Sequence, residues 1–511
     1  MVVTPLLDPT TADSDALEHS ALLDGDPGSF SLSVSSETDC DRTHNDLPSW
    51  IWSSHLRHSI VVCRARSRLV IRRWDRPDVQ FRPALPKTGQ EAIELHRHLE
   101  QSSFPTLPDV ISFVMRTFKA IRYIARDYPS EHSIRLLNIM LLAADRVRSG
   151  AIPANQLAAC RRIRELTDLL DPSKPEVQES VAPVPAPLSN ADVGILPQEL
   201  IETDPRSGLS LFPGLLFRHA ATALYQEAHL DIERSPQLSF PGMGLALGRS
   251  DSLPRDVRFT PTNLARFLAE AAINQLGLAV SSSQTLTVLD PACGSGVFLV
   301  EAVRALIDRG YQGKLRVVGY DISPVSVVIA RFCLHAFACE AAHENVDLTI
   351  NISEFDALAR NWDNADIVLM NPPFISIDRM TEPQQSLARE ILGPLAKGRF
   401  DIAMAFVWKA VASLKQGASL ASVIPASLLS SDSGAPLRDA LRRELKLALV
   451  GRFDGYRFFR SSLVEPAFVV LKKAGDPTCV VTTDTRVIIA REGYEDWALR
   501  ASRLNALDDE S

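Results

Sequence analysis

The sequence predicts an α/β fold built on a parallel sheet, and the evidence lies between residues 286 and 374. Three short apolar, β-branched runs in this stretch each end in a cluster of Gly, Asp, Asn or Pro. Helical patterns follow two of these runs. This alternation is typical of parallel sheets, whose strands carry ligand-binding residues at their carboxyl ends. We therefore expect a binding site where the three runs end.

The first run is followed by a glycine-containing turn. Val288–Leu289 would form the strand, residues 290–296 its tip, and Val297–Arg309 the helix behind it. Two glycines two residues apart allow a tight turn and a close approach of the backbone to a ligand. The turn lacks the third glycine of a dinucleotide site and the Gly-Lys-Ser/Thr of a triphosphate site. A nucleotide-type ligand is favoured, and an ordinary strand–helix turn stays open.

The other two runs end in residues that suit a nucleoside and a flat amine. Arg316–Tyr320 ends at Asp321, whose carboxylate can accept from two ribose hydroxyls. The third run ends at Asn371-Pro372-Pro373-Phe374. The prolines stiffen the chain, the amide offers a donor and an acceptor, and the ring offers a stacking face. A rigid turn after a buried strand is the structural alternative.

Five motifs in order resemble those of the γ-type N6-adenine DNA methyltransferases. They are Phe259-Thr260-Pro261, Asp290–Gly296, Asp321, Phe355–Leu358 and Asn371–Phe374. The resemblance covers about residues 255–475. A mainly helical segment before such a core resembles the modification subunits of restriction–modification systems and related phage-defence assemblies.

The resemblance implies a Rossmann-like S-adenosylmethionine methyltransferase sheet, preceded by a mainly helical domain. It implies S-adenosyl-L-methionine as cofactor, no metal, and DNA as substrate. The residues that it assigns to the cofactor are Phe259, Thr260, Pro261, Asp290, Pro291, Ala292, Cys293, Gly294, Ser295, Gly296, Asp321, Ile322, Asp356, Ala357 and Asn371. The residues that it assigns to catalysis are Asn371, Pro372, Pro373 and Phe374. A target adenine would flip out of the duplex, stack on Phe374 and hydrogen-bond through its amine to Asn371 and the Pro372 carbonyl.

Charge is distributed unevenly along the 511 residues. The net charge is −8, but ten acids and one base before residue 47 account for −9. Between residues 396 and 473, 13 bases stand against six acids, which gives +7. Arginines interleave with aromatic residues at Arg452–Arg460, a pattern that suits phosphates and an unstacked base. Phe458 or Phe459 would then contact the flipped base, although strand packing explains the same residues.

These patterns divide the chain into five segments. Residues 1–46 form a disordered acidic tail, 47–170 a basic strand segment and a helical domain, 171–196 a Pro-rich linker, 197–475 the catalytic domain with its core at 255–475, and 476–511 short strands and a tail. Helical patterns fall at 90–101, 107–127, 132–149, 154–170 and 211–232, whereas 375–397 is expected to be a polar connector. No window is apolar enough for a membrane span, and the acidic start argues against a secretion signal. The seven scattered cysteines suggest reduced thiols and a cytoplasmic protein.

Two questions stay open at this stage. Only about 35 residues follow Lys473, so we expect a separate specificity or restriction subunit, or recognition by the N-terminal half. An RNA or protein-glutamine methyltransferase that uses an Asn-Pro-Pro-Phe/Tyr loop is one alternative. A non-catalytic nucleic-acid-binding subunit that keeps the fold is another.

Overall fold

We describe a computed structural model of the chain. It describes residues 2–6, 17–24, 30–35, 58–63, 66–73, 80–81, 83–101, 107–204, 209–234, 260–276, 285–343, 345–454, 465–473 and 485–491. The chain forms two compact units, residues 1–224 with 503–511, and residues 225–502.

The first unit begins with a six-stranded sheet in the order β1-β2-β3-β4-β5-β6. Its strands are β1 (Val2–Leu6), β2 (Leu17–Asp24), β3 (Phe30–Ser35), β4 (His58–Cys63), β5 (Arg68–Arg73) and β6 (Gln80–Phe81). All neighbours pair antiparallel except β3 and β4, which are parallel. Leu69, Val70 and Ile71 of β5 are all buried, so both faces of this strand pack against other residues.

The acidic start of the chain differs from the expectation of disorder wherever it is described. Residues 2–6, 17–24 and 30–35 are strands, because the local runs are apolar or rich in Ser and Thr. Within these described strands the acids are Glu18 and Asp24. The net charge of residues 1–46 therefore did not indicate the apolar and Ser-rich runs that form these strands.

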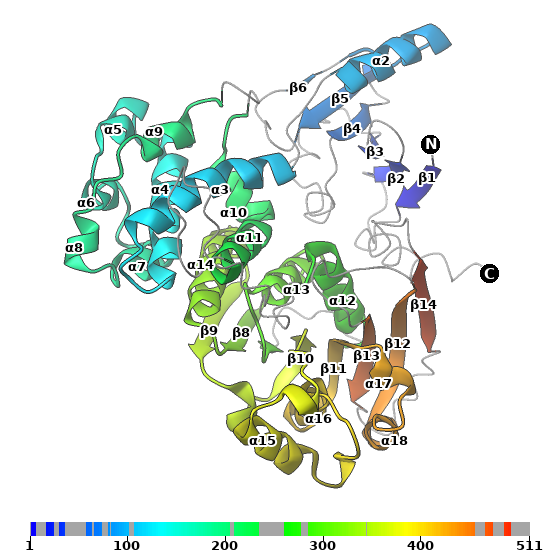
Figure 1. The fold of residues 1–511 in the computed structure, drawn as a ribbon. Coiled ribbons are helices and arrows are strands. Elements are labelled where there is room, and N and C mark those ends of the chain that lie inside the picture. Colours follow the sequence, from blue (N-terminus) through cyan, green and yellow to red (C-terminus); the bar gives the residue numbers. More distant parts are fainter. Residues whose placement is uncertain are drawn as a thin grey trace. The chain divides into compact units, whose positions relative to one another are not determined.

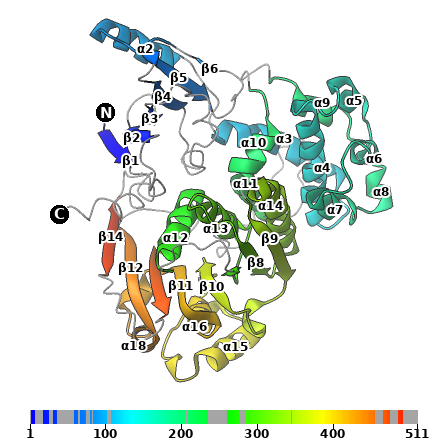
Figure 2. The same cartoon turned by 180° about the vertical axis from the view of Figure 1, so that it is seen from behind.

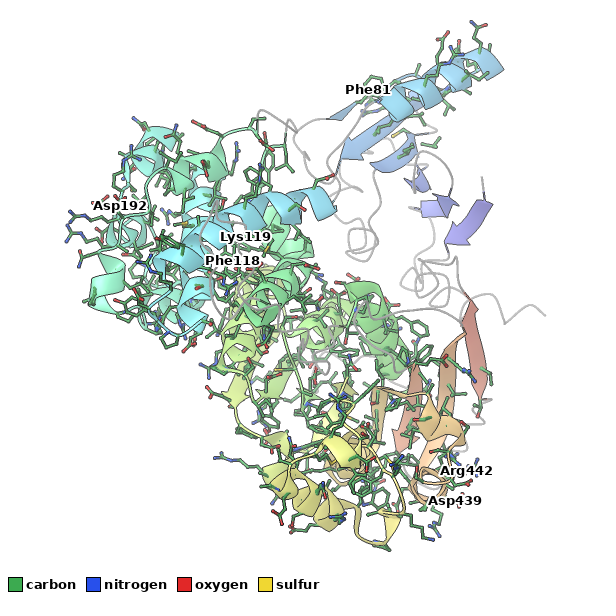
Figure 3. All side chains as sticks on the ribbon, in the orientation of Figure 1. Phe81, Phe118, Lys119, Asp192, Asp439 and Arg442 are labelled. Atoms are coloured by element: carbon green, nitrogen blue, oxygen red, sulfur yellow. The ribbon has the colours of Figure 1, made fainter. Side chains whose placement is uncertain are left out.

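Helices make up the rest of the first unit. They are α2 (Gly89–Gln101), α3 (Leu107–Ile124), α4 (Glu131–Arg148), α5 (Ala154–Ala159), α6 (Ile163–Thr167), α7 (Pro175–Val181), α8 (Ala186–Ser189), α9 (Leu196–Ile201) and α10 (Pro213–His219). Helix α3 is amphipathic, with Phe118 buried and its neighbour Lys119 exposed (Figure 3). Helix α4 is the most buried of them and forms the centre around which α3, α6, α7 and α9 pack.

Residues 171–196 correct the prediction of a Pro-rich linker. They fold into α7, α8 and the start of α9, and their apolar side chains Val177, Leu188 and Val193 are buried. Pro175 and Pro187 stand at the first two positions of α7 and α8, where a missing N–H costs little. These two prolines therefore belong to helix starts in a folded segment.

The second unit is built on an eight-stranded sheet in the order β14-β12-β13-β11-β10-β7-β8-β9. Its strands are β7 (Leu286–Asp290), β8 (Lys314–Asp321), β9 (Asp347–Glu354), β10 (Ala365–Met370), β11 (Leu414–Pro425), β12 (Leu445–Asp454), β13 (Pro466–Lys473) and β14 (Arg486–Arg491). Only β13 runs antiparallel to its neighbours. The order reverses between β7 and β10, the switch point at which open parallel sheets bind ligands. This arrangement confirms the predicted Rossmann-like fold class.

Helices cover both faces of this sheet (Figures 1 and 2). One face carries α12 (Thr262–Asn274), α13 (Val297–Ile307) and α14 (Pro324–His343). The other face carries α15 (Glu382–Leu392), α16 (Ile402–Ser413) and α18 (Ala435–Glu444). The short helix α17 (Ser427–Ser430) follows β11, and three 3-10 turns are η2 (Ala357–Ala359), η3 (Ile377–Arg379) and η4 (Gly393–Leu395). Helix α11 (Ala221–Arg234) reaches into this unit from Tyr225 onward.

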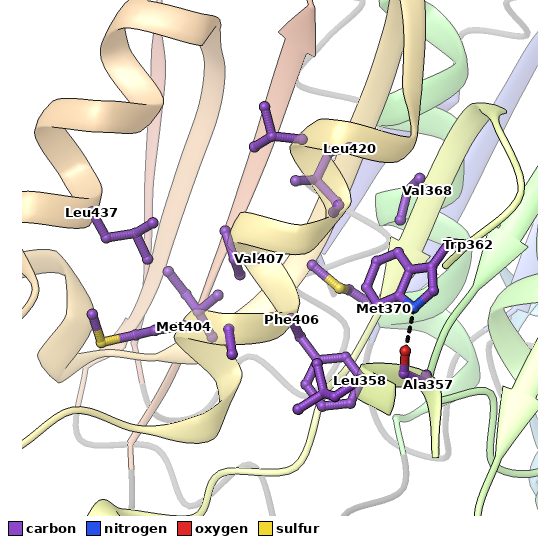
Figure 4. Close-up of a cluster of buried hydrophobic side chains, with 14 of the residues drawn as sticks. Ala357, Leu358, Trp362, Val368, Met370, Met404, Phe406, Val407, Leu420 and Leu437 are labelled. Atoms are coloured by element: carbon purple, nitrogen blue, oxygen red, sulfur yellow. Dashed lines mark hydrogen bonds between the residues drawn. The ribbon is translucent and has the colours of Figure 1, made fainter. Parts of the chain in front are cut away.

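A continuous apolar core lies between the sheet and α16. Trp362, Met370 and Phe406 pack together in it (Figure 4). The Trp362 indole donates to the Ala357 carbonyl over 2.6 Å, which satisfies the one polar atom of this ring and fixes the turn at Ala357.

The expected polar connector at 375–397 also needs correction, because it contains helix α15. Thr381 and Gln384 form a capping box at its start, and Ala388 and Leu392 are buried beneath it. Ser376 and Asp401 form an isolated β-bridge, so the segment between them begins and ends at the same place in the fold.

Two further features concern the apolar helices and the cysteines. In the ranges given above, no helix combines the length and the apolar character needed to cross a bilayer. Cys160, Cys293 and Cys333 are free and buried. Cys63 is disulfide-bonded, which departs from the expectation of reduced thiols throughout.

Candidate functional site

Three of the predicted site residues reach the same edge of the sheet. Asp290 ends β7, Asp321 ends β8, and Asn371 directly follows β10. The strands are parallel, with Asp290 opposite Gly319 of β8, and Leu289 opposite Val368 of β10. Their carboxyl ends therefore meet at the switch point, as the sequence predicted.

The glycine turn after β7 is shaped by two left-handed glycines. Gly294 has φ +51° and Gly296 has φ +79°. Gly296 is the N-cap of α13, and a β-carbon there would lie 3.2 Å from the Ala330 β-carbon of α14. A β-carbon at Gly294 would have no atom within 4 Å. The second glycine thus allows two helices to pack closely, whereas the first borders open space.

Asp290 anchors the start of this turn. Its Oδ1 accepts from the Ala292 N–H over 3.0 Å, and its side chain is buried. Burial raises the pKa of this carboxyl well above the usual range, and the nearby Asp321 charge raises it further. Cys293 is buried in the same turn, and burial also raises the pKa of its thiol, so it is not an activated nucleophile.

Asp321 links two loops of the edge. Its Oδ2 accepts from the Gly294 N–H and its Oδ1 from the Ser323 N–H, both over 2.9 Å. Burial raises the pKa of this carboxyl, although both backbone hydrogen bonds oppose the change. The next residue, Ile322, is 72% exposed. Such exposure of a large apolar side chain beside a carboxylate suits a ligand that is polar on one side and flat and apolar on the other.

Asp356 is exposed and caps the turn η2 after β9. Its Oδ1 accepts from the Leu358 N–H over 2.9 Å. The Lys409 ammonium on α16 donates to the carbonyls of Ala357 and Leu358, over 3.0 and 2.5 Å. Burial lowers the pKa of Lys409 and the Asp356 charge opposes this. Lys409 therefore ties the turn that presents Asp356 to a buried helix.

Asn371 is held by the Thr260 segment. Its Nδ2 donates to the Thr260 hydroxyl over 3.0 Å, which leaves the amide in a defined orientation. Pro372 is buried, and the Phe374 ring is only 2% exposed. A base can stack on this ring only after the loop shifts. Phe259, Phe458 and Phe459 lie outside the described residues.

Helix α11 supplies site contacts that the sequence did not reveal. Gln226 donates from Nε2 to the Thr260 carbonyl over 3.1 Å and to the Ser295 hydroxyl over 3.4 Å. His229 is buried with its Nδ1 3.5 Å from the Ser326 hydroxyl. Burial lowers the pKa of this imidazole, against the opposing charges of Glu233 and Asp321. The only sequence signal was an amphipathic helix at 211–232, which says nothing about these partners.

Comparison with known proteins assigns the same part of the chain to one family. The model of the family described as N-6 DNA Methylase matches residues 257–510. The type II methyltransferase M.TthHB8I of Thermus thermophilus is 30% identical over 215 residues, 41% of this chain and 42% of that protein. The type II methyltransferase M.BanIII of Aneurinibacillus aneurinilyticus is 23% identical over 223 residues, 42% of this chain and 38% of that protein. The matched region thus spans about two fifths of each relative.

A solved structure aligns over a larger share of the chain. It is a type I restriction-modification system methyltransferase subunit from Streptococcus thermophilus, with 15% identity and a TM-score of 0.44. The alignment covers 78% of this chain and 93% of that one.

Proposed function

Because residues 257–510 belong to the N-6 DNA methylase family, we propose that this protein transfers a methyl group from S-adenosyl-L-methionine to the N6 amine of an adenine in DNA. The observation that carries the proposal is the position of Asn371. Its amide is tethered to Thr260 at the switch point, beside the loops of Asp290 and Asp321. The Asn371 amide, which can accept a hydrogen bond from an amine, therefore lies next to residues suited to bind a nucleoside.

The cofactor residues fit S-adenosyl-L-methionine by their chemistry. Asp321 would accept from the ribose hydroxyls, Asp356 from the adenine amine, and the exposed Ile322 side chain would cover the adenine ring. The open space beside Gly294 would take the methionine part. The bound cofactor supplies an electrophilic methyl group on a sulfonium.

Asn371 and Pro372 would prepare the attacking nitrogen. The amide oxygen of Asn371 and the Pro372 carbonyl would accept the two hydrogens of the adenine amine and raise its electron density. An amide is too weak a base to remove a proton first, so the proton would leave to water after the transfer. Catalysis is then mainly a matter of orienting the amine.

Adenine in a duplex is inaccessible to this pocket, so we propose base flipping. Lys397, Arg399, Arg442, Arg443 and Lys446 are exposed within the basic segment 396–473 and would contact phosphates (Figure 3 labels Arg442 on α18). Phe374 would stack on the flipped base once its loop opens. A cytoplasmic modification component of a restriction–modification or phage-defence system, with a separate specificity or restriction subunit, is the setting that we propose.

The test is transfer of tritiated methyl groups from S-adenosyl-L-methionine to unmethylated DNA, followed by nucleoside analysis. We expect N6-methyladenine with the protein alone or together with the products of neighbouring genes. Asn371→Ala should abolish transfer and leave cofactor binding nearly unchanged, because Asn371 acts on the amine. Full activity of this variant, or label found only in RNA or protein, would refute the proposal.

A further inference from the structure

Helix α11 touches three separate loops of the proposed cofactor site. Gln226 donates to the Thr260 carbonyl and to Ser295 in the glycine turn. His229, three residues later and therefore on the same face of the helix, contacts Ser326 in the first turn of α14. The Ser326 N–H donates to the Ser323 hydroxyl over 3.3 Å, and the Ser323 N–H donates to the Asp321 carboxylate over 2.9 Å. One helix face thus contacts the segments of Thr260, the glycine turn and Asp321.

Packing fixes the position of this face. The Tyr225 ring is fully buried and meets Phe332 of α14 edge to face, with centroids 5.6 Å apart. On the far side of the imidazole, Glu233 lies 3.5 Å from His229 Nε2. The histidine is therefore held between a carboxylate and a hydroxyl, and its ring cannot turn without losing both contacts.

The direction of these hydrogen bonds gives His229 a defined task. A hydroxyl has one hydrogen and can also accept. Burial lowers the pKa of the imidazole, so its single hydrogen belongs on Nε2, which faces the Glu233 carboxylate. Nδ1 then accepts from the Ser326 hydroxyl. His229 thereby fixes Ser326 in the first turn of α14, and the Ser326 N–H holds the Ser323 hydroxyl in the loop that follows Asp321.

We infer that Gln226 and His229 are positioning residues that preorganise the cofactor pocket from a helix N-terminal to the family match at 257–510. The inference rests on the proposed function, because it assigns these residues to the S-adenosyl-L-methionine site. Loops that are fixed before binding lose less conformational freedom when the ligand arrives, so affinity rises without any contact to the ligand. Neither residue is expected to act in the chemical step.

The test compares the binding of S-adenosyl-L-methionine by calorimetry in the full-length protein and four variants. Gln226→Ala and His229→Ala should each weaken binding by about threefold to tenfold, the range for one lost hydrogen bond. His229→Asn keeps an acceptor near the Nδ1 position and should bind within about twofold of wild type. Glu227→Gln, on the same helix without these contacts, is the matched control. At saturating cofactor, kcat for DNA should stay close to wild type in all four.

Two results would overturn the inference while the proposed function survives. In the first, wild-type protein binds the cofactor and Gln226→Ala and His229→Ala bind equally well. In the second, His229→Asn is as weak as His229→Ala, or Glu227→Gln is as weak as Gln226→Ala. Melting temperatures identify any loss of cofactor affinity that is caused by unfolding. Gln226 is only half-buried, so we expect Gln226→Ala to stay folded. Wild-type protein that binds no cofactor would refute the proposed function, and the inference with it.

Discussion

The two glycines of the turn after β7 should differ in their response to alanine. Both have positive φ, at which an alanine costs about 1–2 kcal/mol. At Gly296 the new methyl would also lie 3.2 Å from the Ala330 β-carbon and 3.3 Å from its α-carbon, so α13 and α14 must separate. Overpacking of this kind adds about 1–3 kcal/mol. At Gly294 the methyl meets open space, which is the space assigned here to the cofactor.

Thermal melting and cofactor titration of both variants test this reasoning. One kcal/mol shifts the melting temperature of a domain of this size by about 2–4 °C. Gly296→Ala should therefore melt at least about 2 °C below Gly294→Ala in the absence of ligand. Gly294→Ala should lose more affinity for S-adenosyl-L-methionine than Gly296→Ala, although it loses less thermal stability. Equal melting temperatures would show that the close approach to α14 does not constrain the turn, and unchanged affinity of Gly294→Ala would remove the cofactor from this space.

Two further predictions concern Asp321 and Lys409. Burial raises the pKa of Asp321 in the folded state, so the contribution of this group to stability is present below the unfolded pKa and is lost as pH rises through the raised value. Asp321→Asn should therefore melt at or above wild type at neutral pH, with a melting temperature that changes less between acid and neutral pH, and should bind the cofactor at least about tenfold more weakly. A melting temperature that is lower than that of wild type and equally dependent on pH would contradict this. Lys409→Met removes the donor to two carbonyls of the η2 turn and should raise KM for the cofactor by about threefold to tenfold, with little change in kcat. Lys409→Arg should recover part of this loss. A fall in kcat at constant KM would argue that Lys409 does not act through Asp356.

The parts of the site that could be predicted are those written locally in the sequence. Asp290, Asp321 and Asn371 each follow an apolar run, so the end of each strand can be located in the sequence. Parallel pairing of the strands then brings these ends together. The capping box of α15 was equally local, but Thr381 and Gln384 lie in a segment whose polar composition resembled a loop. Gln226 and His229 could not be predicted, because their partners are 34 to 97 residues away in the chain and only the packing of α11 selects them.

The carboxylates at the switch point explain why this edge should bind a cation. Asp290 and Asp321 both have raised pKa values because burial disfavours their charged forms, and the charge of Asp321 adds to the effect at Asp290. A fold that served only stability would gain from replacing such groups with apolar side chains. S-adenosyl-L-methionine carries a net charge of about +1, from a sulfonium, an ammonium and a carboxylate, so its sulfonium and ammonium would favour ionised carboxylates and offset part of the cost of burying them. The raised pKa values of Asp290 and Asp321 therefore fit the cofactor site that we propose at this edge.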